Sequence, residues 1–143
     1  MKKKINLVLD CSGSMGEDGR RQGVAYVLHT LRQSLVKQGV EVEEFTWNHE
    51  GVHPLDGKKL NQLPWSGGLE ERDYRSFCRE KQRETTILLS DGEFPIDQYF
   101  PPHYILYFGE QTGAHRHKNI LYPENLEADV LKICRTEKRR VHA

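Results

Sequence analysis

Two short segments of the sequence carry side chains that could bind a hard metal ion. Asp10, Ser12 and Ser14 follow one apolar run, and Asp91 directly follows another. Carboxylate and hydroxyl oxygens without a neighbouring imidazole favour Mg²⁺, Mn²⁺ or Ca²⁺ over zinc. If the two runs are neighbouring strands, about 4.8 Å apart, Asp10 and Asp91 approach the same point. Two carboxylates that close need a cation, and Mg²⁺ is our first choice.

The segment after the first apolar run resembles the metal-ion-dependent adhesion site (MIDAS) of the von Willebrand factor type A (vWA) family. That site begins with Asp-x-Ser-x-Ser, which matches Asp10, Ser12 and Ser14. The family's later Asp-Gly step, which closes an apolar strand, is similar to Asp91-Gly92. The resemblance implies a vWA domain whose Mg²⁺ is held by these residues. Because so few protein ligands leave coordination positions to water, an Asp or Glu of a partner protein could replace one water.

The middle loop departs from the family pattern. The family usually places a metal-contacting Thr after a Gly-Gly step, whereas here Gly67-Gly68 is followed by Leu69, which cannot bind an ion. Ser66 and Asp73 are alternative oxygen donors. An alternative to the metal-dependent binding module is therefore a scaffold whose metal site is vestigial.

We expect a protein-binding module and not an enzyme. The enzymatic alternative is a metal-dependent phosphatase of the haloacid dehalogenase-like kind, which also carries an Asp after its first strand. Those enzymes need a second Asp two residues later as acid and base, and Ser12 stands at that place.

By family-level analogy, small standalone vWA domains in bacteria often act beside AAA-type ATPases or in stress and defence systems.

Other chemically suggestive residues have simpler interpretations. Cys11 has no assigned base and is typical of a small buried hydrophobe. His115 and His117 lack a third ligand nearby and are typical of a solvated loop. Trp47 and Trp65 are either core residues or exposed anchors for a partner, and Trp65, in a loop at the metal-bearing edge, is the better anchor candidate.

Apolar runs and helical patterns must position these side chains. Strands are expected at Lys4 to Leu9, Val40 to Trp47, Gly51 to Leu55, Thr85 to Leu89, His103 to Phe108 and Asn119 to Tyr122. Helices are expected at Arg20 to Gln38, Leu69 to Arg83 and Leu126 to Cys134. Apolar strands that alternate with helices predict an α/β, Rossmann-like, doubly wound and mostly parallel sheet. Helices should cover both faces, and the hairpin after Trp47 should add one short antiparallel edge strand.

The bulk composition predicts one domain over residues 1–143, with a frayed basic tail at 135–143. Because 21 basic and 21 acidic residues cancel, we expect no nucleic-acid partner. We expect no membrane partner either, since no apolar run approaches the roughly 18 residues of a spanning helix. Three widely spaced cysteines indicate free thiols and a cytoplasmic protein. The oligomeric state is not indicated.

Overall fold

The computed structural model describes residues 3–17, 20–55, 65, 70–91, 103–108 and 120–142. Within these residues a six-stranded sheet has the order β3-β2-β1-β4-β5-β6. The strands are β1 (Lys4–Asp10), β2 (Glu41–Asn48), β3 (Gly51–Pro54), β4 (Thr85–Ser90), β5 (His103–Tyr107) and β6 (Ile120–Leu121). Neighbouring strands are parallel except β3, which pairs antiparallel with β2 at the edge. The predicted sheet and its antiparallel edge strand are confirmed.

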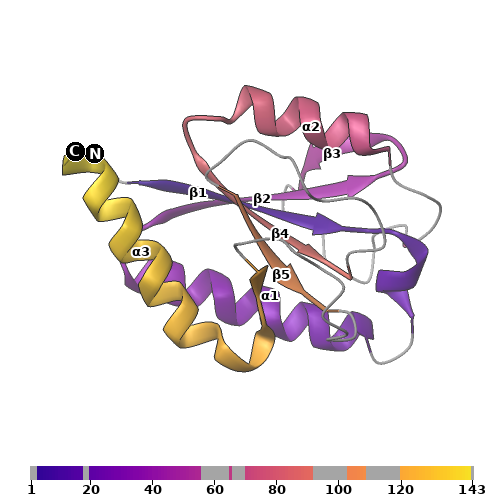
Figure 1. Ribbon diagram of the computed structural model, residues 1–143. Coiled ribbons are helices and arrows are strands. Elements are labelled where there is room, and N and C mark those ends of the chain that lie inside the picture. Colours follow the sequence, from indigo (N-terminus) through magenta and orange to yellow (C-terminus); the bar gives the residue numbers. More distant parts are fainter. Residues whose placement is uncertain are drawn as a thin grey trace.

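Helices lie on both faces of the sheet, as the sequence predicts (Figure 1). Helices α1 (Arg20–Lys37) and α3 (Leu126–His142) cover one face, and α2 (Glu71–Glu80) covers the other. Two short 3-10 helices, η1 (Gly13–Gly16) and η3 (Pro123–Asn125), precede α1 and α3. The chain is therefore a three-layer α/β structure.

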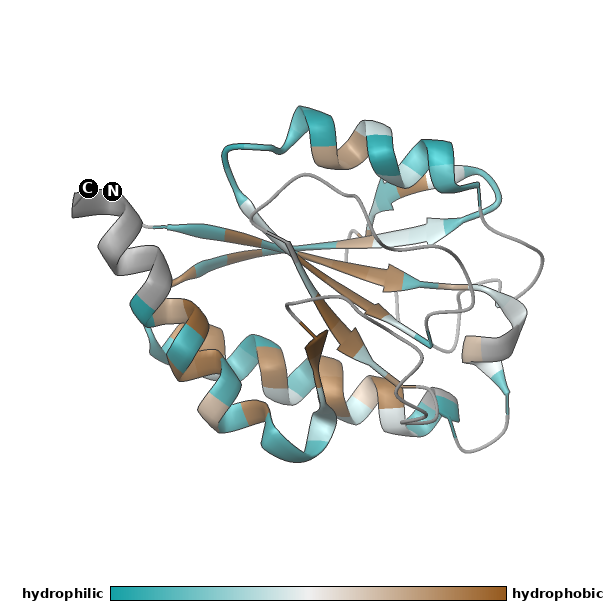
Figure 2. Ribbon diagram, in the orientation of Figure 1, coloured by the Kyte–Doolittle hydropathy of each residue, from teal (hydrophilic) through white to brown (hydrophobic). Residues whose placement is uncertain are grey.

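The central strands are buried on both faces, which explains why their sequences are apolar throughout. Along β1, Leu7 and Leu9 pack in the core beneath α1 and α3, whereas Val8 packs beneath α2. Figure 2 shows hydrophobic residues concentrated on the central strands. Each such aliphatic side chain contributes about 1.5–3 kcal/mol when it is fully removed from water.

Aromatic side chains fill the core beneath α2. The rings of Trp47 and Tyr74 are stacked with centroids 4.8 Å apart, and Phe45 meets Phe77 edge-on at 4.8 Å. Trp47 is fully buried. Of its two predicted roles, the structure therefore supports the core role.

Two helix boundaries differ from the prediction. Helix α2 spans only Glu71–Glu80, and Leu69 lies outside the described residues. Helix α3 continues to His142, beyond the expected end at Cys134, and the frayed tail at 135–143 stays a prediction. That segment is rich in Lys, Arg and Glu, which have high helix propensity, and no Gly or Pro interrupts it.

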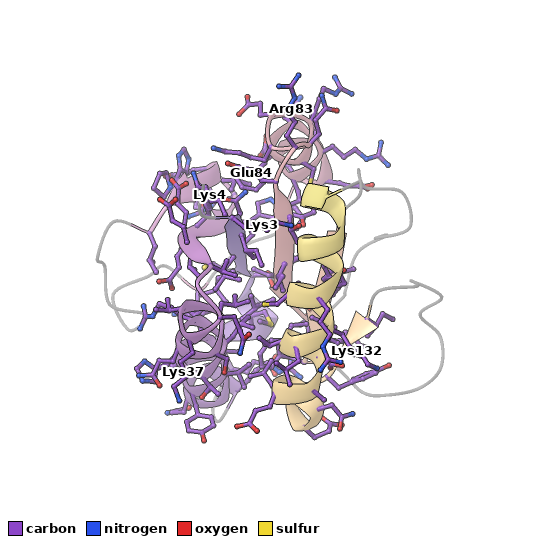
Figure 3. All side chains as sticks on the ribbon, turned by 90° about the vertical axis from the view of Figure 1, so that its left-hand side faces the viewer. Lys3, Lys4, Lys37, Arg83, Glu84 and Lys132 are labelled. Carbon is purple, nitrogen blue, oxygen red and sulfur yellow. The ribbon has the colours of Figure 1, made fainter. Side chains whose placement is uncertain are left out.

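At the amino ends of the strands, opposite charges pair with one another. Figure 3 shows Lys3, Lys4 and Glu84 at this edge. Lys4 forms ion pairs with Glu43 and, at 3.7 Å, with Glu84. Glu84 also accepts a hydrogen bond of 2.8 Å from the Asn6 amide. These half-buried contacts join the starts of three neighbouring strands.

Candidate metal centre

The carboxyl ends of β1 and β4 bring the two predicted aspartates to one edge of the sheet. The strands are parallel neighbours with Leu9 opposite Leu89, so Asp10 ends β1 beside Ser90, and Asp91 follows. Asp10 is 1% exposed and Asp91 4% exposed. The expected adjacency of the two strands is thus confirmed, and open parallel sheets bind ligands at this edge.

The Asp10 carboxylate is held by hydrogen bonds on both oxygens. Its Oδ1 accepts from the Ser12 backbone N–H at 2.8 Å, and its Oδ2 accepts from the Ser90 hydroxyl at 2.6 Å. Burial raises the pKa of Asp10, these hydrogen bonds oppose that rise, and the charge of Asp91 adds to it. The carboxylate is therefore held in one orientation, while burial and the Asp91 charge destabilise its charged form. A cation beside it would stabilise that form.

Asp91 meets a cation of the protein itself. The Arg20 guanidinium lies with Nη1 3.2 Å from Asp91 Oδ2. The Arg20 side chain is 30% exposed and belongs to the first residue of α1. Arg20 is not among the predicted site residues, although the sequence holds a signal: α1 begins with Arg20 and Arg21, at the helix end whose dipole favours anions.

Ser90 was the second residue missed. It is fully buried, and its hydroxyl supplies the short hydrogen bond to Asp10. Its position on β4, directly beside the end of β1, becomes meaningful only once the two strands are paired.

The structure describes some of the other predicted oxygen donors and not others. Ser12 is half-buried at the start of η1, and its carbonyl accepts the Met15 N–H at 3.1 Å. The Ser14 backbone lies within η1, while its side chain, Leu69 and Ser66 lie outside the described part of the chain. Asp73 lies beside Gly51, at the turn between β2 and β3.

Cys11, between the two predicted ligands, is a buried structural thiol. Its N–H donates to the Trp47 carbonyl at 2.9 Å, which joins the ends of β1 and β2. Burial raises the pKa of Cys11 to about 12, with a further contribution from the Asp10 charge. A thiol so buried and so weakly acidic is not a nucleophile at neutral pH.

Trp65 packs against the turn that carries the serines. A Cβ added to Gly16 would lie 2.3 Å from the Trp65 Cβ, so the indole segment and η1 are in close contact. Trp65 is half-buried and also packs on the core beneath α1 and α3. Its role as a partner anchor stays a prediction, and His115 and His117 lie outside the described residues.

The chemistry of the donor set fits a hard cation. Within the described ranges, no group of three or more His, Cys, Asp or Glu side chains could hold a metal, so an ion would also need hydroxyl donors. Among the contacts that the structure describes, two carboxylates, Asp10 and Asp91, meet one guanidinium, that of Arg20. These oxygen donors suit Mg²⁺, with Asp10, Ser12, Ser14 and Asp91 as the predicted ligands.

In the part of the chain that the structure describes, the helices are too short or too polar to cross a membrane.

Comparison with known proteins gives a match by structure and not by sequence. No protein-family model and no curated protein matches the chain significantly. The VWA domain of SpRpn10 matches with a TM-score of 0.59 at 12% identity, over 92% of this chain and 95% of that domain. Proximal thread matrix protein 1 from the mussel byssus matches with a TM-score of 0.56 at 16% identity, over 94% of this chain and 47% of its own. The chain thus spans about half of the mussel protein, and the fold is the von Willebrand factor type A fold.

Proposed function

We propose that this protein is a Mg²⁺-dependent protein-binding module that captures an Asp or Glu side chain of its partner. The observation that carries the proposal is the pair of buried carboxylates, Asp10 and Asp91, at the ends of adjacent parallel strands. A buried carboxylate is costly unless a cation or hydrogen bonds compensate it. Two buried carboxylates together, with the Arg20 guanidinium of α1 beside Asp91, favour a further cation.

In this proposal each residue of the site has a defined role. The Ser90 hydroxyl and the Ser12 N–H fix the orientation of Asp10, so its oxygens need no rearrangement. Ser12, Ser14 and Asp91 would complete the protein's share of the coordination. When bound, the ion supplies a positive charge with open positions that a carboxylate oxygen of the partner can take.

Metal binding is the first test. We expect Mn²⁺, titrated as a paramagnetic substitute for Mg²⁺, to bind one site in the wild-type protein and to lose that site in Asp10→Ala. Asp129→Ala is the matched control, because Asp129 is a half-buried aspartate on α3, which follows the edge strand β6 and not β1 or β4. Absence of Mn²⁺ binding at millimolar concentration would favour the scaffold with a vestigial site.

Partner capture is the second test. Proteins retained from the native host by the wild-type domain in Mg²⁺ should be lost in EDTA and lost with Asp10→Asn. An acidic residue of the retained protein, changed to its amide, should abolish binding to the same degree. Retention that is equal in EDTA would refute a metal-dependent mechanism and leave a metal-independent interaction.

We also infer a cytoplasmic location and a non-enzymatic role, and we propose the AAA-ATPase-associated or defence systems named above as the setting. The three cysteines are free, which suits a reducing compartment. The motif lacks the second aspartate that a phosphatase of the haloacid dehalogenase-like kind requires, since Ser12 stands there. Hydrolysis of a generic phosphate ester that needs Mg²⁺ and is lost in Asp10→Asn would contradict the non-enzymatic role.

A further inference from the structure

We propose that Arg20 is an internal counter-ion that competes with the divalent ion for Asp91 and thereby lowers the ion affinity of the site. This inference rests on the proposed function, because it describes how the same site is regulated. Its geometric basis is the 3.2 Å contact between Arg20 Nη1 and Asp91 Oδ2. A guanidinium and a divalent ion at one carboxylate repel each other, so each weakens the binding of the other.

The two partners of this contact differ in their freedom to move. Asp91 is 4% exposed and is fixed at the end of the buried strand β4, which pairs with β1 and β5. Arg20 has a long side chain that is 30% exposed and starts at the beginning of a helix. The guanidinium can therefore turn toward solvent, whereas the carboxylate must stay in the site.

The position of Arg20 at the start of α1 also affects how firmly its side chain is held beside Asp91. A cation at the start of a helix is opposed by the helix dipole, and the first turn of α1 contains no acidic residue. The contact with Asp91 contributes to the stabilisation that holds Arg20 at this edge. If an ion neutralises Asp91, that contribution decreases and the guanidinium is held less firmly.

Released Arg20 would lie at the edge where the partner's carboxylate arrives. Its guanidinium can form a bidentate pair with a carboxylate, which an ammonium cannot do. The same residue that weakens ion binding in the free protein would then favour an acidic partner in the complex. The ion and the partner would each promote the binding of the other.

The experiment measures Mn²⁺ affinity by calorimetry in the wild-type protein, Arg20→Gln and Arg32→Gln. Arg32 is the matched control, because it lies on the same helix and forms an ion pair with Glu44 at 2.8 Å. We expect Arg20→Gln to bind Mn²⁺ at least about tenfold more tightly than the wild type, and Arg32→Gln to be unchanged.

Equal or weaker binding by Arg20→Gln would overturn the competition and leave the proposed function intact. If no variant binds the ion, both proposals fail. A second measurement needs no substitution: the Arg20 side-chain NMR signal of the wild-type protein should shift as Mg²⁺ saturates the site. A signal that stays unchanged at saturation would show that Arg20 keeps its contact and would overturn the inference.

Discussion

Ser90→Ala tests the electrostatic account of the site most directly. The substitution removes the hydroxyl that donates to Asp10 Oδ2 at 2.6 Å, and both residues are at most 1% exposed. A hydrogen bond to a charged group contributes about 1.5–3 kcal/mol, and water cannot easily replace a donor at so buried a position. The backbone bond from the Phe108 N–H to the Ser90 carbonyl is unaffected by this change. We therefore expect the free energy of unfolding to fall by about 2 kcal/mol at neutral pH in EDTA.

The sign of the pH dependence follows from the role of this bond. The Ser90 hydroxyl opposes the rise in the pKa of Asp10, so it stabilises the charged carboxylate. Its loss is felt in full above the pKa of Asp10 in the folded state. As the pH falls through that pKa, Asp10 becomes protonated and the difference between Ser90→Ala and the wild type should shrink.

Urea denaturation at neutral and mildly acidic pH measures both effects. Ser76→Ala is the matched control, because Ser76 is exposed on α2. In an Asp10→Asn background the effect of Ser90→Ala should fall below about 1 kcal/mol, because the charged acceptor is gone. A loss under about 0.5 kcal/mol in the wild-type background, or one independent of pH, would refute the reasoning.

Three further predictions concern Asp10, the two buried cysteines Cys11 and Cys78, and Gly16. Because the folded state raises the pKa of Asp10, the charged carboxylate destabilises the protein above that pKa; Asp10→Asn should therefore melt higher in EDTA at neutral pH, an advantage that disappears as the pH falls. A lower melting temperature at neutral pH would contradict this. Cys11 and Cys78, with pKa values raised by burial to about 12 and about 11, should resist alkylation by iodoacetamide until the protein unfolds, and labelling of the folded protein, read by mass spectrometry, would show otherwise. Gly16→Ala should lower stability by about 1–3 kcal/mol and change the tryptophan emission, since the new methyl group overlaps Trp65; unchanged stability and emission would mean that the two segments are not packed together.

The sheet could be predicted because each apolar run ends at polar residues that cannot continue it. Lys4 to Leu9 and Thr85 to Leu89 are buried on both faces, and such runs form the central strands of a parallel sheet. The alternation around Phe45 and Trp47 indicated a hairpin, and β2 does pair antiparallel with β3. At these elements the local residue pattern and the global fold favour the same structure, so the pattern alone is enough to predict the strands.

The remaining features of the site depend on contacts between distant residues. Arg20 and Asp91 are 71 positions apart, and Ser90 and Asp10 are 80 apart. Neither pair leaves a periodic signal in the sequence. The continuation of α3 to His142 differs from the prediction for another reason: a basic segment near a chain end is often solvated, whereas the residue types of this one favour a helix.

The charged residues at the two ends of the sheet differ in their burial and pairing, and this difference argues for a functional site at the carboxyl edge. At the amino edge, Lys4 and Glu84 are half-exposed and pair with neighbours of opposite sign, which adds little stability and leaves little strain. At the carboxyl edge, Asp10 and Asp91 are buried, and Arg20 contacts Asp91 at 3.2 Å. Apolar residues of similar volume would often stabilise a fold as well as or better than buried charges. A scaffold alone has no need for two buried carboxylates in close proximity, whereas a site that takes up a cation does.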